Sequence, residues 1–322
     1  MITSWWCDMQ QSRLSLSLST RLWLYCAERF PLASYGLMTV LFSVAGITLS
    51  TVLRLEHRGV SFGDLLNWQH LLGASLTIFA LFFQLRVADE HKDKDNDALY
   101  LPSRPVPRGL ITLNQLSFIA FALGFMQLAI CAMAGPLVLL ILLATWLYLF
   151  LMGREFFCPT FLKARPLVYM VTHMFIMLFC DLLITSFDFS HGTFDLRLLF
   201  FFGASFFNGM VIELGRKIFD SKLEVPGIQS YSSLLGVRGA TCLLLVCSLI
   251  SQCLLLLLMH TDLTRLLFGL TFLVFDCFYV VSLGKAMSAG GAAIASTSTK
   301  CANLSVVVCY LAVLIFKSIE VL

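Results

Sequence analysis

Nine long apolar segments dominate the chain and constrain its fold more than any other feature. A helix needs about 20 apolar residues to cross a hydrocarbon core of about 30 Å, and each segment is close to that length. Because 59% of the 322 residues are hydrophobic and only 13% are charged, a soluble fold is excluded. The sequence predicts an all-α integral membrane protein with about nine transmembrane helices in one bundle. The predicted spans are residues 32–53, 66–87, 113–133, 136–152, 166–186, 196–213, 238–258, 264–283 and 302–320.

The basic residues predict an orientation for this bundle. If the N-terminus is cytoplasmic, all but five of the 22 lysines and arginines fall on the cytoplasmic side. The five on the outer side are Arg54, Arg58, Arg197, Arg265 and Lys317. This bias predicts a cytoplasmic N-terminus and an external C-terminus, in a bacterial inner membrane or an organelle membrane.

Residues 1–31 and residues 32–322 are predicted to have different roles. The first part carries arginines and tryptophans typical of a segment at the membrane interface, and it lacks the pattern of a secretory signal peptide. The second part is predicted to be a single transmembrane domain. Its small-residue-rich stretch 284–301 is expected to be a mobile loop. No charge pattern indicates a nucleic-acid partner, and no feature predicts an oligomeric state.

An acidic stretch follows the second apolar segment and reads RVADEHKDKDNDALYLPSRPVPRG, residues 86–109. If the helix continues to residue 97, Asp89, Asp93 and Asp97 lie four residues apart on one narrow face. Like charges at this spacing repel each other, so the face is destabilised unless cations bind there. An ordinary solvated loop is the alternative interpretation. Glu90 is turned about 100° from Asp89, so its participation stays open.

A second acidic stretch, IELGRKIFDSKLEVPG at residues 212–227, follows the sixth apolar segment. In a continuous helix, Glu213, Asp220 and Glu224 share one face with Lys217, and Arg216 lies beside it. Pro226 and Gly227 are expected to end that helix. Here too a solvated loop is the alternative.

Together the two stretches predict a site for Mg²⁺ and a diphosphate. Mg²⁺ prefers carboxylate oxygens, takes one or two of them, and completes its shell with water and phosphate. Lysine and arginine complement the remaining phosphate charge. Because the site lies at the mouth of an apolar bundle, a lipid diphosphate is the expected ligand.

Three polar residues within the predicted spans are weaker candidates for contact with a second substrate. His173 is expected either to act as a base or acceptor contact or to be a packed, hydrogen-bonded histidine. Asp276 is an ionisable residue inside a span, which usually faces a cavity or a partner. Asn208 either faces the same cavity or bonds a neighbouring helix.

The first acidic stretch resembles the first motif of the UbiA superfamily of intramembrane prenyltransferases. The family pattern is N-D-x-x-D-x-x-x-D followed by R-P-x-P-x-G. Here Asp89 and Glu90 take the first two places, Asp93 and Asp97 match, and residues 104–109 read RPVPRG. Residues 230–236, SYSSLLG, are similar to the S-x-x-x-L-x-G ending of the second family motif. The family's Tyr-x-x-x-Lys pattern corresponds to Lys163, with Pro159 in the tyrosine position.

The resemblance implies a Mg²⁺-dependent enzyme that ionises an allylic prenyl diphosphate and transfers the prenyl group to an aromatic or other lipophilic acceptor. Asp89, Asp93, Asp97, Glu213 and Asp220 are then catalytic. These five, with Glu90 and Glu224, are the implied metal ligands. The implied diphosphate-binding residues are Arg104, Lys163, Arg216 and Lys217.

Three other functions are compatible with the same residues. A terpene cyclase on this scaffold would quench the cation within its own chain and need no acceptor. A cation-binding transporter is disfavoured, because its carboxylates are expected near the membrane midplane rather than at helix ends. An inactive relative is compatible with the glutamates that replace aspartates in the two motifs.

Overall fold

The computed structural model describes residues 16–55, 67–190, 192–224 and 230–321. Over these residues the chain is helical and contains nine helical spans long and apolar enough to cross a membrane. The predicted fold class is therefore confirmed for the described part of the chain. The predicted spans begin and end within a few residues of the observed ones, except where helices extend past the apolar segment.

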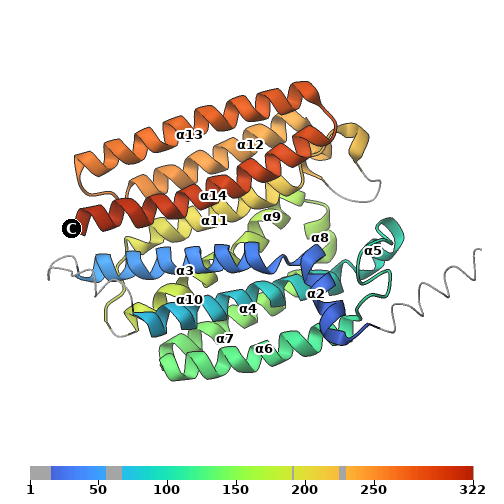
Figure 1. Cartoon of the computed structure of the whole chain (residues 1–322), viewed down its shortest axis with the longest axis horizontal. Helices are drawn as coiled ribbons and strands as arrows, with labels where there is room; N and C mark the ends of the chain where they lie inside the picture. The colour runs from blue at the N-terminus through green and yellow to red at the C-terminus, as the bar shows by residue number, and fades with distance from the viewer. Residues whose placement is uncertain (1–15, 56–66, 191, 225–229, 322) are drawn as a thin grey trace, which may run out of the picture.

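The spans lie side by side along one axis (Figure 1). In chain order they are α3 (Leu32–Leu55), α4 (Trp68–Lys92), α6 (Leu113–Ala134), α7 (Pro136–Gly153), α9 with α10 (Pro166–Met174 and Ile176–Phe189), α11 (Leu198–Arg216), α12 (Tyr231–Leu256), α13 (Asp262–Ala289) and α14 (Ala292–Val321). Short helices connect or precede them: α2 (Leu18–Arg29), α5 (Lys94–Tyr100), η2 (Glu155–Phe157), α8 (Pro159–Lys163) and η3 (Ser221–Leu223).

The core lies between α3, α4, α10, α11, α12 and α14, whose buried side chains form one large apolar cluster. α6 and α13 are outer helices. On α6, Phe118, Phe121 and Phe125 are all more than half exposed. Phenylalanines that are exposed on a membrane-spanning helix face lipid. Because lipid is apolar, these side chains do not have to be buried inside the protein.

The two ends of the bundle carry different short elements (Figure 1). One end, called here the motif end, holds α2, α5, α8 and the turn between α13 and α14. The other, the far end, holds the connection from α12 to α13 and the C-terminus. Both acidic stretches lie at the motif end. Which end faces the cytoplasm stays a prediction from the basic residues.

Stretch 284–301 is not the loop that was expected. α13 continues to Ala289 and α14 begins at Ala292, so only two residues connect them. Gly290 and Gly291 both have positive φ, 67° and 57°, which glycine adopts without steric cost. The alanines and serines that suggested a loop instead allow close helix packing: Ser298 on α14 donates to the carbonyl of Gly215 on α11.

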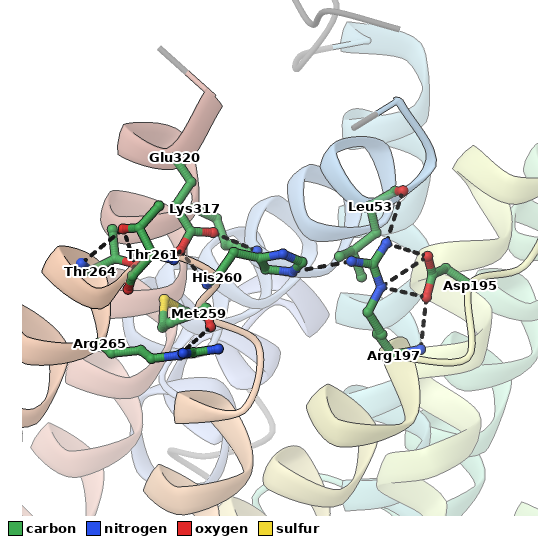
Figure 2. A network of polar contacts seen from close by, with 10 residues as sticks. All are labelled: Leu53, Asp195, Arg197, Met259, His260, Thr261, Thr264, Arg265, Lys317 and Glu320. Carbon is green, nitrogen blue, oxygen red and sulfur yellow. Dashed lines mark hydrogen bonds and ion pairs between the residues drawn. The ribbon is translucent and has the colours of Figure 1, made fainter. Parts of the chain in front are cut away.

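Charged residues at the far end are joined in one network (Figure 2). Arg197 pairs with Asp195 at 2.7 Å and lies 3.1 Å from His260. Glu320 accepts from the backbone of His260 and pairs with Lys317, whose side chain is 1% exposed. Because an unpaired charge is costly in a membrane, these pairs hold the helix ends in one arrangement.

At the motif end, α2 lies over the ends of α4 and α6. Ser17 caps its N-terminus, and Tyr25, Cys26 and Phe30 are buried against α4 and the start of α6. Arg29 on α2 donates to Glu90 at 2.9 Å, and Arg86 donates to the same carboxylate at 2.7 Å. α2 therefore docks through an apolar patch and a charged contact.

Glu90, whose participation in metal binding stays a prediction, is engaged in this contact in the structure. Its side chain is only 1% exposed, and two guanidinium groups occupy its carboxylate. Glu90 lies about 100° around α4 from Asp89, so the two side chains leave the helix in different directions. Its role in this structure is to fix α2 to the acidic motif.

We expect Glu90→Gln to destabilise the protein by about 2 kcal/mol, because two largely buried guanidinium groups lose their anion. The measurement is the thermal unfolding midpoint of the purified protein in detergent. Asp95→Asn is the matched control, since Asp95 is an exposed acid on the neighbouring α5. Equal midpoints for the two variants would contradict the docking role.

Candidate active site

The first acidic stretch does not form one straight helical face. α4 ends at Lys92, and Asp93 (φ −90°, ψ 4°) separates it from α5, which turns away (Figure 1). Asp89 and Asp93 remain one helical turn apart. Asp97 lies on α5, buried, with both oxygens bound by Arg104 at 2.6 and 2.7 Å. Asp97 and Arg104, predicted to hold metal and diphosphate, instead neutralise each other.

The second acidic stretch is also broken. α11 ends at Arg216, so only Glu213 of the three predicted acids lies on it. Glu213 pairs with Lys217 at 2.7 Å and with Arg216. The prediction of a shared helical face for Glu213, Asp220 and Glu224 is therefore wrong.

Asp220 and Glu224 lie in the loop between α11 and α12, where they hold backbone and hydroxyl groups. Asp220 accepts from the backbone of Lys222 at 3.0 Å and of Gly291 at 2.6 Å. Glu224 accepts from Ser230 and Ser232 at the start of α12. Both carboxylates have a structural use, and neither contacts Glu213.

The ends of α4 and α11 nevertheless bring their charges together. Asp93 is within electrostatic range of Lys217, and Asp89 is within range of Arg216. We call this group the charged mouth: Asp89, Lys92, Asp93, Glu213, Arg216 and Lys217. Three acids and three bases thus gather at the ends of the two helices that carry the acidic stretches.

Tyr169 contributes to the charged mouth without any motif to mark it. Its hydroxyl lies 2.5 Å from Nζ of Lys92, which also contacts Asp89 at 3.4 Å. In the sequence, Lys92 contributes to the predicted membrane orientation. Its position three residues after Asp89 also places it on the same helical face. Tyr169 could not be found in this way, because it is 77 residues away in the sequence.

The connection between α7 and α9 carries Lys163 and Glu155. The Lys163 side chain is 64% exposed on α8, and its Nζ lies 4.0 Å from Glu155. Glu155 is buried and acts electrostatically on Tyr169. A buried carboxylate is thus one charged group that this connection brings near the mouth, and the role of Lys163 stays a prediction.

The three weaker candidates have separate environments. Asp276 accepts from Gln252 at 3.0 Å, between α13 and α12, and α13 packs mainly against α14 and α12. Asn208 accepts from Ser251 at 2.9 Å, between α11 and α12. Both therefore have helix–helix contacts. His173 lies near the charged mouth, stacked on Tyr169.

A magnesium ion with a diphosphate fits the charged mouth better than a bare ion does. Among the described residues, no three His, Cys, Asp or Glu side chains are close enough to chelate a metal. Asp93, however, makes no side-chain hydrogen bond or ion pair with any described residue. Burial raises the pKa of its carboxyl, and the charges of Asp89 and Asp97 add to this, against Lys92 and Lys217. A carboxylate left in this state is stabilised by a cation that takes few protein ligands.

Comparison with known proteins supports the same interpretation of the fold. The UbiA prenyltransferase family matches residues 59–314. No curated protein sequence matches the chain significantly. A solved structure described as giving structural and mechanistic insights into digeranylgeranylglyceryl phosphate synthase in membranes is 17% identical, with a TM-score of 0.54. The apo structure of a UbiA homologue from Aeropyrum pernix K1 is 14% identical, with a TM-score of 0.61.

Each alignment covers 89% of this chain and 98% of the other, so the likeness extends over nearly the whole fold. At these identities it shows a shared fold. The family match covers most of the chain, including both acidic stretches and the connection between them. The chain belongs to the UbiA prenyltransferase family.

Proposed function

We propose that the chain is a Mg²⁺-dependent prenyltransferase that ionises an allylic prenyl diphosphate at the charged mouth. It would transfer the prenyl group to an aromatic or other lipophilic acceptor inside the membrane and release diphosphate. The family supplies the general activity. The three acids and three bases at the ends of α4 and α11 support the proposal that a diphosphate and a metal bind there.

The observation that carries the proposal is the unpaired carboxylate of Asp93. Two other acids at this end are occupied: Asp97 by Arg104, and Glu213 by Arg216 and Lys217. Asp93, in contrast to Asp97 and Glu213, has no direct ion pair, and the negative charge of Asp89 acts on it. A carboxyl whose pKa is raised by burial and by like-charged neighbours is typical of metal and catalytic sites.

The bases of the charged mouth would bind the diphosphate oxygens. Lys92 and Lys217 are each less than half exposed, lie at the ends of α4 and α11, and are both within electrostatic range of Asp93. As the bond from the allylic carbon to oxygen breaks, these ammonium groups stabilise the charge that develops on the leaving diphosphate. Bound Mg²⁺ would supply further stabilisation of that charge.

The bundle would protect the allylic cation from water. Behind the charged mouth the facing side chains of α9 and the 155–157 turn are aromatic: Tyr169, His173 and Phe156 lie in ring contact. Aromatic faces stabilise a nearby cation. The prenyl chain would extend between the helices, and the acceptor would enter from the lipid. The orientation predicted by the basic residues places this mouth on the cytoplasmic side.

The direct test uses purified full-length protein with labelled geranyl, farnesyl and geranylgeranyl diphosphates. We expect release of diphosphate with Mg²⁺ and none with EDTA. Asp93→Asn should lower the rate by about 100-fold or more, since it removes a ligand used in the transition state. Asp95→Asn, an exposed acid two residues away, should leave the rate unchanged.

Three outcomes bear on the other functions that the residues allow. Product formed from the donor alone would favour a cyclase on the same site. Diphosphate that is never released from any donor would contradict the enzyme and favour an inactive relative. Equal rates for the Asp93 and Asp95 variants would remove Asp93 from the mechanism.

A second prediction concerns the stability of the ligand-free protein. Because the folded pKa of Asp93 is raised, its contribution to stability falls as the pH rises from its ordinary value of 3.8 through the folded value, and it is lowest above that. Asp93→Asn should therefore raise the unfolding midpoint by about 1 to 2 °C at about pH 8, and by less near about pH 5. Mg²⁺ with inorganic diphosphate should stabilise the wild type and not the variant. A variant less stable than the wild type at high pH would contradict the destabilising effect that is expected of the ionised Asp93 carboxylate.

A third prediction concerns binding of the donor. Lys217→Gln removes a cation that lies 2.7 Å from Glu213 and within range of Asp93. We expect the donor KM to rise about tenfold or more, because a charge-assisted bond to phosphate contributes about 1.5 to 3 kcal/mol. Lys222→Gln, at an exposed position on η3, is the control. The same KM in both variants would exclude Lys217 from donor binding.

A further inference from the structure

His173 is a buried histidine one helical turn below the charged mouth. It is 7% exposed and lies on α9, four residues after Tyr169. Its ring stacks on the Tyr169 ring, with centroids 3.8 Å apart and planes 13° from parallel. The Phe156 ring meets it edge-on at 6.0 Å. The imidazole is therefore held in one orientation by two aromatic neighbours.

The hydrogen bonds of His173 define its tautomer. Nδ1 lies 2.9 Å from the backbone oxygen of Tyr169. Because a carbonyl oxygen only accepts, Nδ1 must carry the proton. In a neutral ring Nε2 then has a free lone pair. Nε2 is buried, and no described residue donates a hydrogen bond to it. An unsatisfied buried acceptor costs about 1 to 3 kcal/mol. The folded protein bears this cost at a basic nitrogen.

The position of His173 relates it to the proposed substrate. It lies within electrostatic range of Lys92 and Asp89 on α4 and of Glu213 on α11. One turn of helix separates it from Tyr169, whose hydroxyl contacts Lys92. A diphosphate held by the bases of the charged mouth would therefore place its allylic carbon about 5 Å deeper, near the level of His173.

Three other groups near this depth are already paired with cations. Glu213 is paired with Arg216 and Lys217, and Asp89 contacts Lys92. The Tyr169 hydroxyl is bound to Lys92. When His173 becomes charged, the Asp89 and Glu213 carboxylates would favour that charge, against burial and the charge of Lys92.

We propose that Nε2 of His173 is the general base that takes the proton released when the allylic cation is quenched. This inference rests on the proposed function. The carbon–oxygen bond of the donor breaks, and its electron pair leaves on the diphosphate. An electron pair of the acceptor forms the new bond to the allylic carbon, and the acceptor's proton passes to Nε2. Without an acceptor, an adjacent C–H bond of the cation supplies the electron pair for a new double bond, and Nε2 takes that proton instead.

The test separates ionisation from proton removal. The full chain is incubated with Mg²⁺ and labelled farnesyl or geranylgeranyl diphosphate, with and without 4-hydroxybenzoate as an aromatic probe. Released diphosphate measures ionisation. The prenyl group is then divided between hydrocarbons and prenylated probe, called here proton-loss products because each loses a proton from the substrate inside the site, and the prenyl alcohol, whose proton can pass directly to water.

His173→Asn keeps an N–H for the Tyr169 carbonyl but has no basic nitrogen. We expect it to release diphosphate within about threefold of the wild type, while the ratio of proton-loss products to alcohol falls about 100-fold. Val171→Ala, at an exposed position on α9, controls for local packing and should leave this ratio unchanged. An unchanged ratio in His173→Asn would overturn the proposal. A wild type that releases no diphosphate would instead overturn the proposed function, and the inference would fail with it.

A second measurement does not depend on turnover. Nitrogen-15 NMR of the histidine-labelled protein, with His173→Asn to assign the signals, reports which ring nitrogen carries the proton. We expect Nδ1 to be protonated and Nε2 to have the chemical shift of a bare nitrogen. A protonated Nε2 in the ligand-free protein would overturn the base role.

Discussion

The pairing of charges in a medium that does not solvate them is the constraint on which this structure depends. Asp188 at the far end is held by Arg54 at 2.7 Å and by two hydroxyl groups. Glu90 at the motif end is held by two arginines. An isolated charge at such depth would be expensive, so each pair also specifies which helix ends meet. The apolar segments provide the spans, and the charged pairs select one arrangement of them.

The region around the charged mouth departs from this pairing in several ways. Asp93 has no direct cation, and Nε2 of His173 has no donor. Next to them, Glu155, Phe156 and Phe157 all have positive φ, which costs about 1 to 2 kcal/mol for each residue that is not glycine. That turn buries Glu155 and places Phe156 against His173. Strain and unsatisfied groups that gather in one place are characteristic of a functional site.

The sequence predicted the spans well because lipid imposes a length and a polarity on each helix. It failed where the outcome depends on contacts between distant residues. Glu90 lies in the acidic motif at the position of an expected ligand, but its carboxylate accepts a hydrogen bond from Arg29, 61 residues away. The break at Asp93 and the end of α11 at Arg216 removed the continuous acidic faces that regular periodicity implied. Tyr169 has no motif, and its part in the site comes from the packing of α9 near α4 and α11.

The balance of the charged mouth explains why a metal and a diphosphate should bind together. Its three acids and three bases compensate one another in the empty protein. A diphosphate alone would bring further negative charge next to Asp89, Asp93 and Glu213, whereas a cation alone would be repelled by Lys92, Arg216 and Lys217. The charges of a magnesium–diphosphate pair largely cancel, so the pair disturbs this balance less than either component. Binding of the proposed donor together with its metal thus follows from this distribution of charge.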